Sequence, residues 1–267
     1  MELEAVDFNR GNIVLPEGCS WALKEVTLVN SNGIAVDSRK HSKNLFGGEI
    51  NTPPTFTIKE QLKIAEDCLK ALKKDGATVN YRCNTQTHVG GWDDPNSEKE
   101  TLKRLKAVQQ YAFNNYKPLL LLTMGKGQWE KKDHYPTSFW SHYKERMVPA
   151  WKHKYLMEAK TLNEFRKAMF FSKAGTHAPL CFMRQGINTH SFFKTQTIEF
   201  RIFWGTLDIE HIKKMLQFSK AFMDDALGSQ DAFNYLVEYF RNSFPPENEF
   251  NQELETGFIQ TRVAKPS

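Results

Sequence analysis

An acid and a guanidinium lie two residues apart in the segment TIEFRIFWGTLD, residues 197–208. Branched and aromatic residues alternate along this segment, which predicts a strand, and side chains two apart on a strand project from the same face. Glu199 and Arg201 are therefore expected to project together. Because a buried charge is costly, such a pair in the middle of a strand suggests a functional site. The alternative is a salt-bridged pair on an exposed sheet face.

Three further acids and one histidine occur in comparable surroundings. Glu2 and Glu4 would share one face of a strand, where a divalent cation would offset their repulsion; a frayed acidic terminus is the alternative. Glu49 follows two glycines, which permit close backbone approach or simply a turn. His88 precedes two more glycines and is open to a ligand, although a single histidine also suits a structural role.

The elements that would position these residues are predicted by periodicity and capping signals. Asn32-Gly33 predicts a hairpin over residues 21–36. Apolar spacing and cap residues predict four helices, and alternation predicts a strand that leads to His88. The helices are expected at 57–74, 97–116, 161–171 and 209–226, the strand at 77–89, and a last helix at about 231–243. Residues 118–124 form an apolar run that periodicity leaves open between strand and helix.

Composition places the chain among globular proteins. Its 267 residues, 40% of them hydrophobic, fit one large domain or two small ones. The charge of +5 attracts anions in general, which include both nucleotides and nucleic acids. Four cysteines without C-x-x-C spacing indicate reduced thiols and argue against a cysteine zinc site. With no apolar run of membrane-spanning length and no signal-like start, we expect no membrane association and a cytoplasmic protein.

The order of several short segments resembles the amidoligase family. These carboxylate-amine ligases share the fold of glutamine synthetase and glutamate-cysteine ligase. The similarity extends from residue 2 to about residue 225, and E-F-R-x-F-x-G-T-L-D is its most specific part. The matching segments are E-L-E at 2–4, D-S at 37–38, G-E-I-N-T-P-P at 48–54, T-H-V at 87–89, R-x-x-x-N at 184–188 and T-I-E-F-R-x-F-x-G-T-L-D at 197–208.

The resemblance implies an α+β fold, in which a curved, mostly antiparallel sheet holds ATP and Mg²⁺ or Mn²⁺ on its concave face and helices pack on its outer face. It implies a single catalytic domain over residues 1–243. The polar, aromatic and poorly periodic stretch at 128–155 predicts a loop or lid insertion, and residues 244–267 form a polar tail in the sequence. The residues that match metal ligands are Glu2, Glu4, Glu49, His88 and Glu199; those that match nucleotide or acyl-phosphate contacts are Arg184, Asn188 and Arg201.

Two departures from the family pattern stand out. The family usually has a glycine and an apolar residue before the first acid, whereas this sequence starts at Met1. The histidine segment usually reads C-G-x-H-V-H, but here Gly90 occupies the place of the second histidine. This difference bears on substrate contacts near His88.

The predicted function is therefore ATP- and magnesium-dependent joining of a carboxylate to an amine through an acyl phosphate. Glu199, Arg201 and His88 are the predicted catalytic residues, and the base that deprotonates the amine stays open between a carboxylate and His88. The predicted partners are small-molecule or peptide acids and amines. Two alternatives are phosphoryl transfer to a guanidine in the same fold, and an inactive protein that binds nucleic acid, which the intact acids disfavour.

Overall fold

The computed structural model describes most of the chain and divides it into two compact units. The first unit comprises Met1–Thr87 and Phe203–Gln217, and the second comprises His88–Ile202 and Phe218–Ser267. Each unit is described by itself below. The described residues are 1–22, 28–29, 35–36, 47–80, 83–115, 119, 150–170, 185–228, 235–236 and 238–239.

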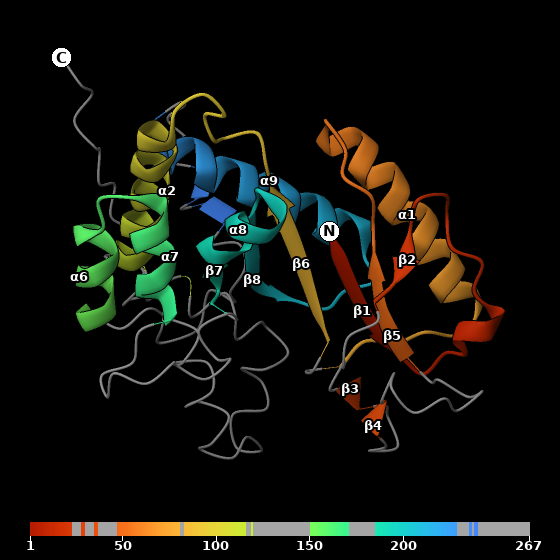
Figure 1. Ribbon diagram of the computed structural model, residues 1–267. Coiled ribbons are helices and arrows are strands. Elements are labelled where there is room, and N and C mark those ends of the chain that lie inside the picture. The colour runs from red at the N-terminus through yellow and green to blue at the C-terminus, as the bar shows by residue number, and fades with distance from the viewer. Residues whose placement is uncertain are drawn as a thin grey trace. The chain divides into compact units, whose positions relative to one another are not determined.

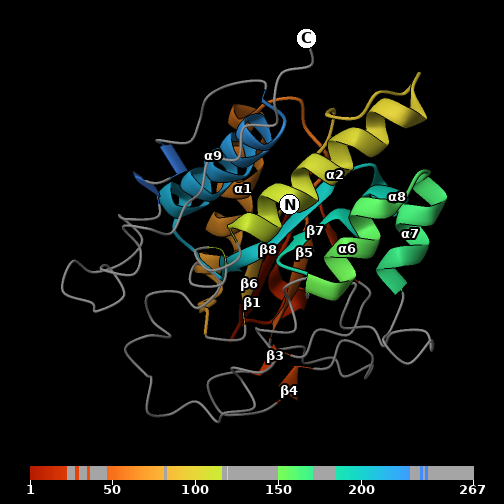
Figure 2. The same cartoon turned by 90° about the vertical axis from the view of Figure 1, so that its left-hand side faces the viewer.

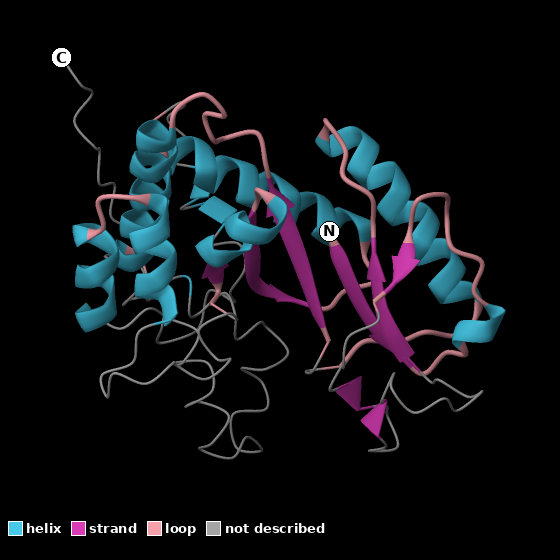
Figure 3. Ribbon diagram, viewed as in Figure 1, coloured by secondary structure: helices cyan, strands magenta, loops and turns pink. Residues whose placement is uncertain are grey.

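Among the described residues, the strands form one open six-stranded sheet and one separate antiparallel pair (Figures 1 and 3). The strand order of the sheet is β2 (Ser20–Trp21), β5 (Gly47–Asn51), β1 (Glu2–Val6), β6 (Asn84–Val89), β8 (Ile198–Trp204) and β7 (Ile187–Asn188). β1 pairs antiparallel with both β5 and β6, and β7 pairs antiparallel with β8. The boundary between the units falls inside β6 and inside β8. This mixture of helices with antiparallel strands confirms the α+β class, while likeness to glutamine synthetase stays a prediction.

Four of the described helices begin at the predicted caps. Thr57 and Glu60 form a complete capping box at the start of α1 (Ile58–Lys74), because each side chain accepts a hydrogen bond from the other residue's backbone N–H. The side chains of Ser97, Thr161 and Asp208 likewise accept from backbone N–H groups in the first turn. These three residues precede α2 (Glu98–Asn114), α7 (Leu162–Phe170) and α9 (Ile209–Ala226).

In the first unit, one face of the sheet is covered by α1. Leu3 lies opposite Ile50 in the β1–β5 register, and both are almost fully buried. They belong to one apolar cluster that includes Leu69 from α1 and Ile212 from the start of α9. The alternating residues of β1 and β5 therefore face the other side of the sheet.

The second of the two glycines before Glu49, Gly48, lies where a side chain would be crowded. A Cβ on Gly48 would meet the Trp21 ring and the Arg10 side chain at 3.2 Å. The Arg10 guanidinium itself lies 4.5 Å from the Trp21 ring centroid. This glycine therefore makes room for two side chains of the protein.

In the second unit, the apolar face of β8 packs against aromatic residues of α9. The rings of Phe200 and Phe222 meet edge to face with centroids 5.4 Å apart. Tyr111 of α2 makes a similar contact with Phe222 at 4.9 Å, and its hydroxyl donates a 2.5 Å hydrogen bond to Asp225. Phe200 thus holds β8 against α9, and its neighbours Glu199 and Arg201 project from the opposite face of the strand.

The hairpin prediction is confirmed for its strands, because β3 (Leu28–Val29) pairs antiparallel with β4 (Ala35–Val36). The strand expected over 77–89 is shorter, since only a single bridge between Val6 and Thr78 precedes β6. Residues 150–155, expected in the loop or lid, instead begin helix α6 (Ala150–Glu158). Residues 128–149, the apolar run at 120–124 and the tail at 244–267 lie outside the described residues.

The described structure also contains the short elements η1 (Arg10–Asn12), η4 (Thr189–Ser191) and α8 (Phe192–Thr195). Among the described residues, no helix combines the length and the apolar character required to cross a membrane. The single catalytic domain expected over 1–243 stays a prediction.

Candidate active-site residues

Three of the predicted acids share one face of the sheet in the first unit. Glu4 lies directly opposite Glu49 in the β1–β5 pair, and Glu2 lies opposite Asn51 on one side and Gln86 on the other. Directly opposed residues of an antiparallel pair project from the same face, with Cβ atoms about 4.5–5.5 Å apart. The expectation that Glu2 and Glu4 form a frayed terminus is wrong, because both lie in a paired strand.

Glu4 is fixed by two hydrogen bonds from the residue that opens β6. The backbone N–H of Asn84 donates to Glu4 Oε2 at 2.6 Å, and the Asn84 side-chain amide donates to the same oxygen at 3.1 Å. Both Glu4 and Glu49 are buried, with 9% of each residue exposed. Like charges directly opposed on a sheet repel, so this pairing has an electrostatic cost that a cation between the carboxylates would offset.

Glu199 is held from both sides in the second unit. Arg201 Nη1 donates to Glu199 Oε1 at 2.5 Å, and Asn188 Nδ2 donates to Oε2 at 2.5 Å. Asn188 lies opposite Glu199 in the β7–β8 register, and its own Oδ1 accepts from the backbone N–H of His190 at 3.1 Å. Each carboxylate oxygen has two lone pairs, so Glu199 retains capacity to accept from a further group.

The Glu199–Arg201 pair is mostly withdrawn from solvent. The Glu199 side chain is 8% exposed and that of Arg201 is 20% exposed. The alternative of an exposed, surface-facing ion pair is therefore wrong. An ion pair in this setting is sensitive to the loss of either partner, since the remaining charge is left buried.

His88 lies near Glu199 within the same unit. One ring nitrogen of His88 and one carboxylate oxygen of Glu199 lie within 4.8 Å of each other, a separation at which both can bind one ion. The Nδ1 atom of His88 is 3.1 Å from the hydroxyl of Thr197. If Nδ1 carries the proton and donates to Thr197, Nε2 is the ring nitrogen that would bind an ion.

His190 is a candidate that the sequence pattern did not single out. It is buried, and this burial, together with Lys194 and Arg166, lowers the pKa of its imidazole, while Glu199 acts in the opposite direction. The imidazole is therefore neutral at pH 7. The sequence gives only a weak signal for His190, which is its position two residues after the predicted site residue Asn188.

The remaining predictions have separate outcomes. The Asn188 side chain donates a hydrogen bond to Glu199 and so positions that carboxylate. Arg184 lies outside the described residues. Gly90, which replaces the expected second histidine, has room for a Cβ because the nearest atom, in Thr197, would be 3.4 Å away.

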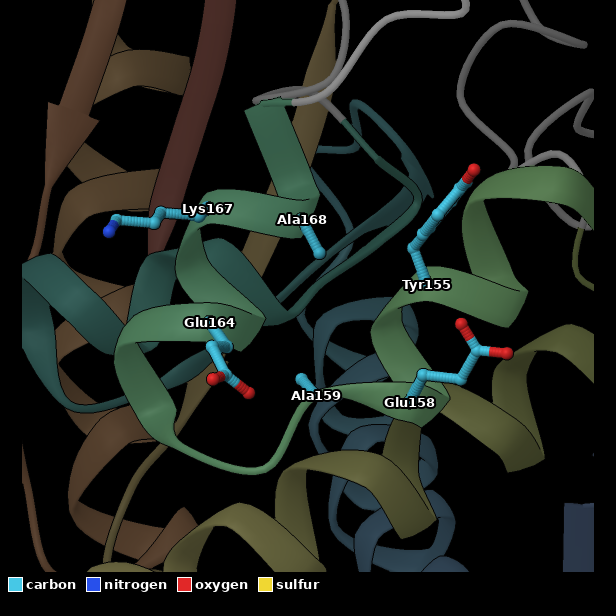
Figure 4. A pocket seen from close by; sticks show the side chains of 6 residues that line it. All are labelled: Tyr155, Glu158, Ala159, Glu164, Lys167 and Ala168. Atoms are coloured by element: carbon cyan, nitrogen blue, oxygen red, sulfur yellow. The ribbon is translucent and has the colours of Figure 1, made fainter.

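A separate hollow of about 280 Å³ lies between α6 and α7, which run side by side (Figures 2 and 4). Tyr155 and Glu158 line it from α6, and Glu164 and Lys167 line it from α7. None of these is a candidate residue of the predicted site. The hollow therefore does not correspond to that site.

One comparison with known proteins gives a match, and it is to a family. A family model described as "Putative amidoligase enzyme" matches residues 29–223, which is more than half of the 267 residues. The chain belongs to the amidoligase family. Membership indicates a ligase that acts on small molecules. No curated protein and no solved structure matches the chain.

The amidoligase match includes Glu49, His88 and the Glu199–Arg201 strand, but it begins after β1. The assignment of Glu2 and Glu4 therefore does not depend on the matched segment. It depends on the register that sets Glu4 opposite Glu49 and Glu2 opposite Gln86.

Proposed function

We propose that this amidoligase is an ATP- and divalent-cation-dependent carboxylate-amine ligase, built on a glutamine synthetase-like sheet, that forms an amide through an acyl phosphate. The observation that carries the proposal is the set of acids on one sheet face. In the first unit, Glu4 opposes Glu49 on that face. In the second unit, Glu199 is held between Asn188 and Arg201.

The donor atoms fit Mg²⁺ or Mn²⁺. Both ions prefer oxygen ligands, and Mn²⁺ also accepts an imidazole nitrogen. We assign one ion to His88 and Glu199, which lie in the same unit and each offer one ligand atom.

We assign a second ion to Glu4 and Glu49. Two buried carboxylates that face each other across a strand pair form a binding surface for a hard cation. Such ions, when bound, neutralise nucleotide phosphate charge. Asn84 restrains Glu4 through two hydrogen bonds, so its carboxylate needs little reordering to bind.

Arg201 would act on phosphate oxygens. Its guanidinium is held beside Glu199 by one Nη1 contact, and a guanidinium has five N–H donors. The planar fork of a guanidinium suits bidentate contact with phosphate oxygens. Such a group stabilises the charge that develops as a γ-phosphoryl group moves, which is the main task of a phosphoryl-transfer site.

The proposed reaction proceeds in two steps. A substrate carboxylate oxygen attacks the γ-phosphorus of ATP and releases ADP, which leaves an acyl phosphate. The amine then attacks the acyl carbon, the C–N bond forms, and inorganic phosphate leaves. The amine loses a proton to a base, for which a carboxylate and His88 are the candidates from the sequence; neutral His190 is a third.

The test is ADP release by purified protein with Mg²⁺ or Mn²⁺ and panels of acids and amines. We expect release only when an acid and an amine are both present, together with an amide product. Glu199→Gln and Glu4→Gln should each lower turnover at least about 100-fold, because each removes a charged ligand. Glu210→Gln, which changes an exposed acid on α9, is the matched control and should retain turnover.

Binding of a non-hydrolysable ATP analogue with Mn²⁺, measured by calorimetry, separates the alternatives. Nucleotide binding with a phosphorylated guanidine and no amide would replace the proposal by phosphotransfer. Absence of nucleotide binding, together with nucleic-acid binding that weakens steeply with salt, would replace it by the inactive binding protein. Full turnover of Glu199→Gln would refute the assigned residues.

A further inference from the structure

Two cysteines distant in sequence bring their sulfur atoms together in the first unit. The Sγ atoms of Cys19 and Cys68 are 3.7 Å apart. Cys19 lies in the turn before β2, where its backbone N–H donates to the carbonyl of Pro16 at 3.1 Å. Cys68 lies in the middle of α1 and belongs to the apolar cluster beneath β1 and β5.

The two thiols differ in their exposure to solvent, so they are expected to react in a fixed order. Cys19 is partly exposed, so a small reagent can reach it, whereas Cys68 is fully buried. Burial raises the pKa of both thiols, which keeps them protonated and makes them slow nucleophiles at pH 7. A reagent is therefore expected to react first at Cys19, and Cys68 can then act only on the neighbouring sulfur.

We propose that Cys19 and Cys68 form a reversible intramolecular disulfide by exchange with a low-molecular-weight disulfide such as glutathione disulfide. The sulfurs must move from 3.7 Å to a bond length of about 2.05 Å. Rotation about the Cα–Cβ bond of Cys19 carries its sulfur through an arc wider than this gap. The turn that holds Cys19 contains Gly18 in the left-handed region, at φ +76°, and lies outside any helix.

The exchange balances in two steps. The Cys19 thiolate attacks one sulfur of glutathione disulfide, so a mixed disulfide forms and one glutathione leaves as a thiolate that takes up a proton. The Cys68 thiolate then attacks the Cys19 sulfur and expels the second glutathione. Two protein thiols are oxidised, one small disulfide is reduced, and excess glutathione reverses both steps.

The bond would join the turn before β2 to helix α1 in the first unit. Cys19 leads directly into β2, whose Trp21 pairs with Ile50 of β5. Cys68 is on the helix that covers the opposite side of the same cluster. The disulfide would therefore tie the outer strand of this unit to α1.

The experiment incubates the folded, full-length protein with glutathione disulfide, blocks remaining thiols with iodoacetamide, and maps peptides by mass spectrometry without reduction. We expect a peptide pair linked through Cys19 and Cys68, and loss of that pair after dithiothreitol. The matched control Cys83→Ser should give the same pair, because Cys83 is buried elsewhere, beside Val6 and Leu28.

A second variant traps the intermediate. In Cys68→Ala the resolving thiol is absent, so the reaction should stop at glutathione bound to Cys19. Wild-type protein that stays unmodified at Cys19, that retains glutathione on Cys19 without the link, or that joins Cys19 to Cys83 or Cys181 would overturn the proposal. The wild-type map decides the question even if Cys68→Ala fails to fold.

Discussion

Breaking the Glu199–Arg201 pair tests whether this strand contains a buried functional pair or an ordinary surface contact. The perturbation is a double-mutant cycle of Glu199→Gln, Arg201→Met and their combination. Glutamine keeps the shape of glutamate and methionine keeps much of the length of arginine. The cycle therefore isolates the interaction of the two charges from changes in side-chain volume.

The magnitude follows from the separation and burial of the pair. Two unit charges 2.5 Å apart attract by roughly 7 kcal/mol at an effective dielectric constant of about 20, before desolvation is subtracted. Removal of one partner from a fully buried pair costs about 3–5 kcal/mol. Because Arg201 keeps a fifth of its side chain exposed, we expect a coupling energy of about 2–4 kcal/mol.

The assay is urea unfolding of the four proteins, with the free energy of unfolding extrapolated to water. A matched control cycle uses Glu210 and Lys213 on α9, whose side chains are 67% and 45% exposed and 3.4 Å apart. That pair should couple by no more than about 0.5 kcal/mol. Equal coupling energies in the two cycles would refute the reasoning from burial.

Three further predictions concern single positions. Gly205→Ala should lower the free energy of unfolding by about 1–3 kcal/mol, because its Cβ would lie 2.4 Å from that of Cys83; Gly90→Ala should change it little in the same urea assay. Asn188→Ala should reduce turnover about 10- to 100-fold while the protein stays folded by circular dichroism, since Glu199 loses a 2.5 Å hydrogen bond; full turnover would exclude a positioning role. Burial lowers the pKa of His153 in the folded protein, so on acidification this histidine takes up a proton more readily in the unfolded state than in the folded state. The free energy of unfolding should therefore fall as the pH drops below about 6.5. In His153→Phe the free energy of unfolding should fall less between pH 7.5 and 5.5 than it does in the wild type, and an unchanged slope would contradict this role of His153.

The helices were the most predictable part of the fold, for a local reason. A cap such as Thr57 with Glu60 and an apolar spacing along 57–74 both act within one helix, so the sequence contains the whole signal. The start of α6 was missed because Ala150–Glu158 is only weakly amphipathic. Its buried Lys152, which donates to the carbonyl of Met169, gives no apolar signal of its own.

The site was predictable in residue types and only partly in contacts. Alternation in 197–208 identified Glu199 and Arg201 as neighbours on one face, because that relation is local to one strand. The roles of Asn188 and Asn84 as supports for carboxylates depend on pairing between segments up to 80 residues apart. No local pattern encodes which distant amide meets which acid.

The register of β1 keeps Glu2 and Glu4 on the sheet face away from α1, and apolar residues such as Leu3 fix that register. If β1 slipped by one residue along β5, Glu2 and Glu4 would turn toward the apolar side of α1, and Leu3 would turn away from Ile50. Each carboxylate forced into that environment would cost several kcal/mol, far more than any pairing gained. The carboxylates are thus aligned by the aliphatic layer behind them. A polar residue in place of Leu3 would therefore weaken the alignment of the acids without touching either of them.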